Sequence, residues 1–250
     1  MPSELGEFFN GIPLITRYWF TASLVLPLLG RIGLINPLWM FLDWELVVSK
    51  FHFWRPLTSL LYYHVTPQTG FHWLLMLYFM YNYSKNLESD VFSGRPADYL
   101  YMLVINWILC VGICMAANIP WLLDPMVMSV LYVWCQLNKD QIVSFWFGMR
   151  FKAMYLPWVL CAFNAVLSGG GMIEIIGILV GHTYYFLAFR YPLEHGGASL
   201  LKTPEFFYRF LPNEVGGVHG FGQERVAQRR AAAGGGGGAH NWGRGMQLGD

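Results

Sequence analysis

The side chains that could carry chemistry in this sequence are a few polar residues inside long apolar segments. Glu174 opens the apolar stretch EIIGILVGHTYYF, which also contains His182, and Ser129 lies in an earlier stretch. A hydroxyl nucleophile needs a neighbouring base whose pKa lies near neutrality. One hypothesis is therefore an intramembrane enzyme in which Glu174 is an acid or a base. The other is a structural role, because a carboxylate in the first turn of a helix meets the positive end of the helix dipole.

The cysteines do not add a redox or metal site to these residues. They lie inside apolar runs, at Cys110, Cys114, Cys135 and Cys161. Cys110 and Cys114 share one helix face at a spacing of four residues, but no histidine in that run completes a set of metal ligands. We therefore expect small core residues, with no disulfide framework, no metal and no other cofactor.

The elements that hold these residues are set by an apolar composition. Hydrophobic residues make up 55% of the 250 residues and charged residues only 12%, whereas an ordinary soluble domain has about 25% charged residues. The mean hydropathy is +0.39. The composition therefore predicts an integral membrane protein. The net charge of +1 identifies no partner, and no nucleic-acid partner is expected.

Long apolar runs predict an all-α polytopic membrane protein with six spanning helices. The runs cover residues 18–36, 71–87, 98–117, 122–137, 153–169 and 172–189. A hydrocarbon core of about 30 Å needs about 20 helical residues. The fourth run is only about 24 Å long at the helical rise. Short spans of this kind thin the bilayer around them or deform it.

The basic residues predict the orientation of this bundle. With six spans, both termini lie on one side, and thirteen of the 16 lysines and arginines fall on that side. Only Arg31, Lys50 and Arg55 fall on the other. The positive-inside rule therefore places both termini in the cytosol. Ahead of the membrane domain, 18–189, the cytosolic segment 1–17 is either a short helix on the membrane face or a disordered lead-in.

Aromatic residues crowd the expected non-cytosolic loop, residues 37–70. Trp54 precedes Arg55 in the segment FHFWRPLTSLLYYH, and aromatic rings favour the headgroup layer of a membrane. Arg55 can snorkel there as an anchor. The alternative is an ordinary interfacial loop.

His72 and Glu174 begin the second and sixth expected spans at that same face. Ionisable residues within a membrane usually face water or the interior of the helix bundle. We therefore expect a wet groove at this face, lined by Trp54, Arg55, His72 and Glu174. The alternatives are a helix-start glutamate and a histidine that is hydrogen-bonded locally.

Glycines mark one expected helix contact. Gly177 and Gly181 form a GxxxG pattern, which places two residues without side chains on one helix face and lets a neighbouring helix approach closely. The pattern alone is a weak signal because glycine is common in membrane helices. Residues 169–171 are all glycine and predict a tight turn, so spans five and six should be antiparallel neighbours.

Several distinctive segments follow one another over about residues 1–215: RYWF, FWRPLTS, GRPADY, SVLYVWCQLN, SFWFG, FKAMYLPW and FRYP. In this order they resemble the Derlin family of rhomboid-like proteins, and the tail ending HNWGRGMQLGD is most similar to the type-one derlins. The resemblance implies a rhomboid-like six-helix fold in the endoplasmic reticulum membrane. It also implies a non-catalytic role in moving misfolded luminal and membrane proteins to the cytosol for degradation.

The resemblance also bears on the hypothesis of an enzyme. Rhomboid proteases use a serine in span four and a histidine in span six, three residues before the GxxxG. This chain has Met128 and Glu174 at those positions, and Ser129 is one residue out of register, turned by about 100° on its helix. His182 lies about two turns further along its helix. The resemblance therefore implies no catalytic residues, with an active intramembrane serine protease as the alternative.

A solute transporter is a third hypothesis for an apolar chain of this kind. Such folds show paired broken helices in two repeated halves. The sequence has no such pairing of its apolar segments. The transporter hypothesis is therefore disfavoured.

The cytosolic tail, residues 190–250, begins with a helix signal. Thr203, Pro204 and Glu205 read as an N-cap, an N1 proline and a first-turn acid. Aromatic residues follow them, so we expect a short aromatic helix that rests on the membrane. A glycine run at 234–238 then predicts a flexible spacer.

The last ten residues, NWGRGMQLGD, resemble the SHP box by which derlins engage the valosin-containing AAA ATPase. The expected contact residues are Trp242, Gly243, Gly245, Met246 and Leu248. Family members often have glutamine where Met246 stands, and a disordered end is the alternative. The resemblance further implies ubiquitin-ligase membrane complexes, misfolded substrates, the lipid bilayer and other derlin copies as partners.

Overall fold

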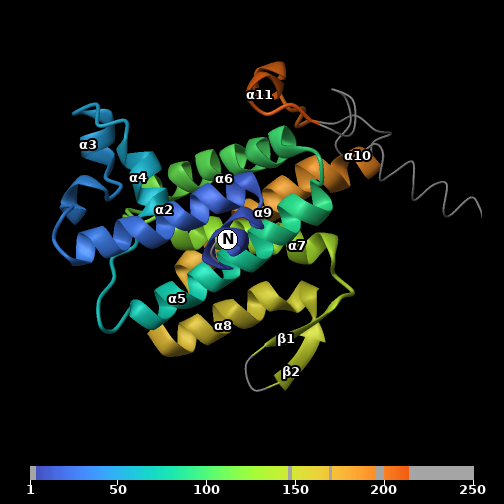
Figure 1. Cartoon of the computed structure of the whole chain (residues 1–250), viewed down its shortest axis with the longest axis horizontal. Helices are drawn as coiled ribbons and strands as arrows, with labels where there is room; N and C mark the ends of the chain where they lie inside the picture. Colours follow the sequence, from blue (N-terminus) through green and yellow to red (C-terminus); the bar gives the residue numbers. More distant parts are fainter. Residues whose placement is uncertain (1–3, 146–147, 169–170, 195–199, 214–250) are drawn as a thin grey trace, which may run out of the picture.

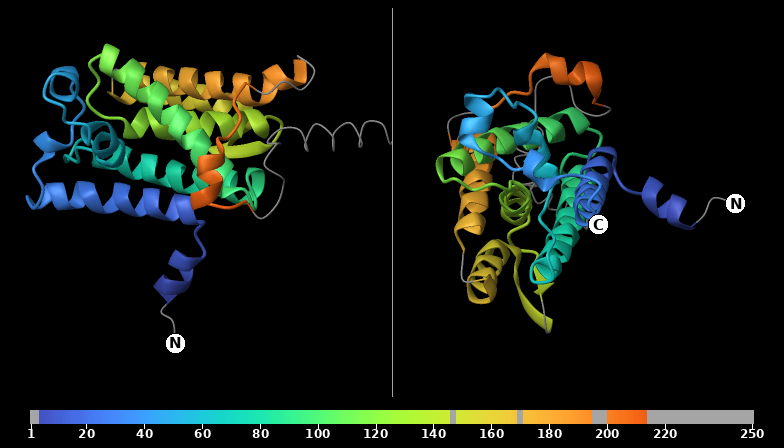
Figure 2. Two further views of the ribbon diagram at one scale, coloured as in Figure 1. Left: turned by 90° about the horizontal axis from the view of Figure 1, so that it is seen from above. Right: turned by 90° about the vertical axis from the view of Figure 1, so that its left-hand side faces the viewer.

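A computed structural model describes residues 4–145, 148–168, 171–194 and 200–213 of the chain. The fold is mostly helical, as expected. Its long helices run side by side along one direction and form a bundle (Figure 1). We call the end where α2 begins and α9 finishes the tail end, and the opposite end, which carries α3 and α4, the loop end (Figures 1 and 2).

The first half of the chain supplies two long helices and several short ones. Its elements are α1 Glu4–Asn10, α2 Leu14–Arg31, the 3-10 helix η1 Pro37–Trp39, α3 Trp44–Val48, α4 Arg55–Leu61, α5 Gly70–Phe79, the π-helices η2 Met80–Ser84 and η3 Leu87–Val91, and α6 Pro96–Ala116.

The second half supplies the central helix and its neighbours. Its elements are α7 Leu123–Leu137, the strands β1 Ile142–Phe145 and β2 Met149–Lys152, the 3-10 helix η5 Ala153–Tyr155, α8 Leu156–Ser168, α9 Met172–Tyr185, the π-helix η6 Phe186–Arg190, α10 Tyr191–Glu194 and α11 Glu205–Phe210.

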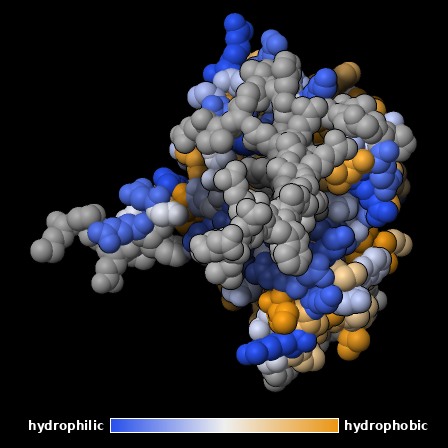
Figure 3. Space-filling view, turned by 90° about the vertical axis from the view of Figure 1, so that its right-hand side faces the viewer, coloured by the Kyte–Doolittle hydropathy of each residue, from blue (hydrophilic) through white to orange (hydrophobic). Residues whose placement is uncertain are grey.

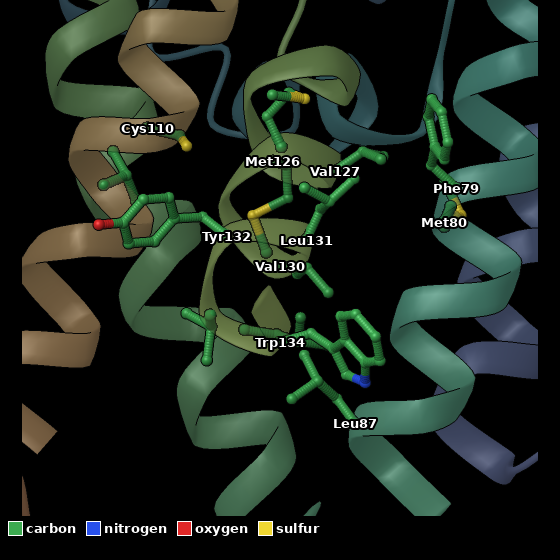
Figure 4. Packing of buried hydrophobic residues seen from close by; sticks show 14 of the residues in the cluster. Phe79, Met80, Leu87, Cys110, Met126, Val127, Val130, Leu131, Tyr132 and Trp134 are labelled. Atoms are coloured by element: carbon green, nitrogen blue, oxygen red, sulfur yellow. The ribbon is translucent and has the colours of Figure 1, made fainter. Parts of the chain in front are cut away.

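Helix α7 forms the centre of the bundle. Every residue from Leu123 to Cys135 is buried. The side chains of α7 fill the space between α6, α9 and the helix formed by α5 and η2 (Figure 4). Tyr132 points toward α9, whereas Trp134 packs against Tyr83, with ring centroids 4.8 Å apart. A helix surrounded in this way is apolar on all sides because it meets protein everywhere.

The strands β1 and β2 correct the expectation of an all-α fold. They pair antiparallel, with Ile142 opposite Lys152 and Phe145 opposite Met149. The turn includes Gly148, whose φ of +75° lies in the left-handed region that glycine adopts without strain. Residues of high β-propensity on both sides of such a turn favour a hairpin.

The expected bounds of the first span also need correction. The apolar run suggested 18–36, whereas α2 covers Leu14–Arg31. Gly33 has a φ of +81°, so the backbone leaves the helix while the sequence is still apolar. The sixth expected span, 172–189, continues as helix to Glu194, through the π-helix of residues 186–190 and past Pro192.

Two helices in the described part of the chain are long and apolar enough to cross a membrane. They are Pro96–Ala116, with 21 residues, and Met172–Glu194, with 23. The apolar helices Leu123–Leu137 and Ala153–Val166 are shorter.

Candidate functional site

Ser129 lies at the centre of the bundle and is fully buried. Its Oγ donates a hydrogen bond to the carbonyl oxygen of Met126 at 2.8 Å and accepts one from Asn106 Nδ2 at 3.2 Å. Both partners hold the hydroxyl inside the helix packing. The geometry is that of a core serine whose hydrogen-bonding capacity is used by α6 and α7.

His182 does not approach this hydroxyl. Its Nδ1 lies 2.8 Å from the phenol oxygen of Tyr132, and the histidine side of this pair faces outward, because His182 is exposed. The two residues come from α9 and α7, so the contact ties these helices together near their tail ends.

Gly177 and Gly181 lie where α9 comes closest to α7. A Cβ atom on Gly177 would stand 2.5 Å from Met128 Cβ and 2.6 Å from the carbonyl oxygen of Pro125. A Cβ atom on Gly181 would stand 2.6 Å from the carbonyl oxygen of Ser129. Real side chains do not tolerate such distances. The GxxxG pattern therefore sits in a backbone-to-backbone contact, and α7 is the neighbour that it admits.

Glu174 is 6% exposed and accepts a hydrogen bond from Asn164 Nδ2 at 2.8 Å. Asn164, on α8, is 2% exposed. The carboxylate also stands in the first turn of α9, near the positive end of the helix dipole. The Asn164 amide and the N-terminal end of α9 are therefore the polar surroundings of this buried carboxylate.

His72 pairs with Asp124, a residue that no sequence pattern predicted as part of this site. The His72 Nε2 and Asp124 Oδ2 atoms are 3.2 Å apart, and the two side chains are 19% and 13% exposed. The second oxygen of this carboxylate, Asp124 Oδ1, is buried without a hydrogen-bond partner among the described residues. Each residue lies in the first turn of its helix, α5 or α7, at the loop end.

Tyr63, in the loop before α5, completes this polar region. Its ring lies 6.0 Å from the His72 ring, centroid to centroid. Burial raises the pKa of the Tyr63 phenol well above its usual range, and the negative charges of Asp124 and Glu174 raise it further. The phenol therefore stays protonated beside the two carboxylates.

Trp54 and Arg55 lie in a different part of the loop end. Trp54 is 52% exposed and stacks on His52 at 4.5 Å. Arg55 is only 5% exposed and donates hydrogen bonds to the carbonyl oxygens of Leu38 and Phe41, both at 2.9 Å. Its guanidinium therefore holds the loop together instead of snorkelling to the headgroups.

The four expected groove residues thus divide into two sets. His72 and Glu174 begin α5 and α9, which lie on different sides of α7, and they share the region with Asp124 and Asn164. Trp54 and Arg55 instead organise the aromatic loop. A signal for Asp124 and Asn164 was available, since each is a polar residue within an apolar helix. The expected ATPase-binding residues, from Trp242 to Leu248, lie outside the described residues.

Comparison with known proteins places the chain in a family. The model of the Der1-like family matches residues 12–205. The chain is 61% identical to Derlin-1 of Caenorhabditis elegans over 249 residues, which cover 98% of this chain and 99% of that protein. It is 54% identical to Derlin-1 of Homo sapiens, over 99% of both chains. Derlin-1 of Drosophila melanogaster is 44% identical, over 98% of this chain and 99% of that one.

These relatives and the apolar helices together indicate a membrane protein. The family model covers most of the described bundle, from the residues before α2 to the first residue of α11. The identities extend over nearly the whole chain at a level that chance does not produce. The chain belongs to the Der1-like family and is a type-one derlin.

Proposed function

We propose that this derlin is a non-catalytic component of the endoplasmic reticulum membrane that helps misfolded proteins reach the cytosol for degradation. In this proposal the chain crosses the membrane six times, both termini are cytosolic, and the tail recruits the valosin-containing AAA ATPase. Ubiquitin-ligase membrane complexes and further derlin copies are the proposed partners. The resemblance to derlins implies each of these properties, and family membership supports them.

The bundle supports the proposed topology. Within the described part of the chain, six helical stretches connect its two ends: α2, residues 70–91, α6, α7, α8 and residues 172–194. The tail end carries most of the basic residues, and Figure 3 shows many hydrophilic residues on the part of that face left uncovered. The loop end has Arg31, Lys50 and Arg55. The positive-inside rule then assigns the tail end to the cytosol.

The closed contact between α7 and α9 is the observation that carries the non-catalytic assignment. Hydrolysis of a peptide needs a nucleophile that substrate can reach, beside a base within hydrogen-bond distance. Gly181 brings the α9 backbone against Ser129 itself, and the serine hydroxyl is already held by Met126 and Asn106. Substrate has no approach to this hydroxyl while the two helices are in contact.

The polar region at the loop end supports a substrate-facing role instead. Asp124, His72 and Glu174 lie in the first turns of three helices that start at the same end of the bundle. Ionisable residues at such depth usually face water or the bundle interior. In the proposal this region opens to the lumen and receives polar segments of the substrate.

Helix length supports the proposal of a thinned bilayer, and in this proposal α8 accounts for the thinning more directly than α7. Although α7 is short, its residues from Leu123 to Cys135 are enclosed by other helices, so lipid does not meet its length. Helix α8 has 13 residues and spans only about 20 Å. Trp158 is 54% exposed and Val166 is 85% exposed on its outer face. In the proposal, the lipid beside α8 shortens to match this helix.

Ser129→Ala tests the non-catalytic assignment. We expect the rate of degradation of a misfolded membrane substrate to stay near the wild-type rate, because the hydroxyl has only structural partners. We also expect the purified wild-type protein not to cleave a model transmembrane peptide. Pulse-chase decay in cells and peptide cleavage in detergent are the two measurements.

Asn106→Ala is the matched control for this experiment. It removes the same hydrogen bond between α6 and α7 but leaves the serine hydroxyl in place. A packing effect therefore appears in both variants, whereas a catalytic effect appears in Ser129→Ala alone. Peptide cleavage by the wild type that Ser129→Ala abolishes and Asn106→Ala preserves would establish the protease alternative.

Trp242→Ala tests recruitment of the ATPase. Aromatic anchors dominate short contacts of this kind, and losing one costs about 2 kcal/mol, or about thirtyfold in affinity. Binding of the purified full-length protein to the ATPase is the measurement, with Arg244→Ala as a nearby charge control of smaller effect. Deletion of residues 240–250 should abolish capture. Equal binding by the wild type and the deletion variant would place recruitment elsewhere on the chain.

A further inference from the structure

Asp98, in the first turn of α6, binds the chain that follows α10. Its side chain is only 4% exposed. Three side chains of that later segment donate hydrogen bonds to the carboxylate: Thr203 Oγ1 at 2.6 Å, Tyr208 OH at 3.0 Å and Asn213 Nδ2 at 3.1 Å. Arg95 Nε, from the residue just before α6, lies 3.0 Å from Asp98 Oδ2. We call residues 200–213, which include α11, the strap.

This contact is strong because the carboxylate is buried. A buried charge is unfavourable unless it is paired and its oxygens accept hydrogen bonds. Arg95 supplies one partner, and the strap supplies the other three. Burial raises the pKa of the Tyr208 phenol, so this group keeps the proton that it donates. The strap is therefore fixed at both of its ends and in its middle.

The strap runs along a face of α6 that the bundle covers only in part. Phe207 of α11 packs edge-to-face on Tyr101, with ring centroids 5.5 Å apart. Ile105 and Ile108 follow Tyr101 at spacings of four and seven residues, so the three share one helix face. Ile108 is 53% exposed. Figures 1 and 2 show α11 on the outside of the bundle, against the first half of α6.

The free side of α11 is aromatic. Phe206 is 61% exposed and Phe210 is 68% exposed, and their rings stack edge to face with centroids 4.8 Å apart. Leu200 is 57% exposed at the start of the strap. Two cations, Lys202 and Arg209, and one acid, Glu205, are exposed beside these apolar groups. Aromatic rings flanked by cations match the boundary between anionic headgroups and acyl chains.

We propose that the strap inserts the aromatic side of α11 into the cytosolic leaflet beside α6 and that Asp98 holds it at that depth. The occupant of this surface is lipid, because α6 is one of the two helices in the described part of the chain that are long and apolar enough to cross a membrane and α11 lies against its partly exposed face. The strap thereby fixes the point where the tail leaves the membrane. This inference rests on the proposed topology.

Fluorescence quenching of the full-length protein tests the depth of the strap. A nitrobenzoxadiazole label is attached to Phe206→Cys, with the four native cysteines replaced by alanine. The protein is reconstituted into phosphatidylcholine vesicles that contain phosphatidylserine. We expect nitroxide lipids to quench this label several-fold more than they quench a label at Asp140→Cys, a position 79% exposed beyond the bundle. Aqueous iodide should show the opposite order.

Two further variants test the role of Asp98. Asp98→Asn should lower lipid quenching at position 206 several-fold and raise iodide quenching. Thr203→Val combined with Tyr208→Phe should do the same while leaving Asp98 and Arg95 intact, so a folding defect at Asp98 does not decide the result. Lipid quenching that survives both variants would show that the Asp98 contacts do not hold the strap.

Two other outcomes would contradict lipid as the occupant of the aromatic side of α11. Iodide quenching at 206 equal to that at Asp140 would place α11 in water. Protection from both quenchers would mean that a protein, either a partner or a second copy, covers the aromatic side. A glycosylation tag added after residue 250 tests the proposed topology independently of the strap. Its modification in cells would refute cytosolic termini, whereas lipid quenching at 206 would still place the strap in a leaflet.

Discussion

Gly181→Leu and Gly177→Leu are each expected to unfold the bundle or to lower its thermal stability more than any surface substitution. At Gly181 even a Cβ atom would stand 2.6 Å from the carbonyl oxygen of Ser129, and at Gly177 it would stand 2.5 Å from Met128 Cβ. Overpacking of a core typically costs about 1–3 kcal/mol. Here part of the obstruction is backbone, which cannot rotate away, so we expect the upper part of that range or more. Thermal unfolding in detergent measures the effect.

Gly112→Ala is the matched control for these glycine variants. Gly112 also lies within an apolar helix, α6, but a Cβ atom there meets nothing within 4 Å. Alanine at a free helical position stabilises by about 0.5–1 kcal/mol relative to glycine. We therefore expect Gly112→Ala to melt at the same temperature as the wild type or slightly higher, and Gly181→Ala to melt lower. A melting temperature for Gly181→Leu equal to that of the wild type would contradict the close packing.

The glycine contact was predictable because its cause lies in a local spacing. Four residues separate Gly177 and Gly181, so a helix places them on one face whatever its surroundings. The sequence did not reveal that α7 is the neighbour, because that depends on how all the helices arrange. Apolar runs likewise located the helices but not their ends. Helix α2 stops at Arg31 because the backbone turns at Gly33, although the following residues are still apolar.

The polar pairs were less predictable than the glycines. Glu174 and His72 stood out as single ionisable residues in apolar surroundings, but their partners come from other helices. Asn164 lies on α8 and Asp124 on α7, and neither spacing nor composition connects them to those residues. Arg55 shows the converse error. Its place in an aromatic loop suggested a membrane anchor, whereas carbonyl oxygens of the same loop bind its guanidinium.

Glu88 offers the clearest case of a contact that the sequence could not show. Helix α2 follows Pro13, which has no side chain able to cap the helix, and its first turn has no acidic residue. The carboxylate of Glu88 performs this role from elsewhere in the chain. It accepts hydrogen bonds from the backbone N–H of Ile15 at 2.9 Å and of Thr16 at 2.8 Å, and from the Thr16 hydroxyl at 2.7 Å. These N–H groups are among those that a helix leaves unpaired.

The Glu88 cap is shielded from solvent and belongs to a larger hydrogen-bond network. Glu88 is 8% exposed, and Thr16 is fully buried. The Thr16 hydroxyl also lies 2.7 Å from Ser84 Oγ, which in turn lies 2.5 Å from the phenol oxygen of Tyr99. The network thus joins α2 to the end of the 70–91 helix and to the first turn of α6. A charged acceptor at the N-terminus of α2 also meets the positive end of its dipole.

Glu88→Ala should therefore destabilise the tail end of the bundle. Each buried N–H left without an acceptor costs about 1–3 kcal/mol, and this substitution leaves those of Ile15 and Thr16. We expect a marked fall in melting temperature and faster hydrogen exchange at these two amides. Ser89→Ala, at the exposed neighbouring position, should change neither measurement.

Glu88→Gln separates the charge from the shape of the cap. The amide oxygen of glutamine still accepts a hydrogen bond from one N–H group. Its NH₂ group takes the place of the second carboxylate oxygen and therefore faces another donor. We expect a melting temperature between that of the wild type and that of Glu88→Ala. Hydrogen bonds to a charged group are worth about 1.5–3 kcal/mol, which sets the size of the difference. Unchanged exchange at Ile15 and Thr16 in Glu88→Ala would mean that another group caps α2. In that case the Glu88 carboxylate would not be what attaches α2 to the rest of the bundle.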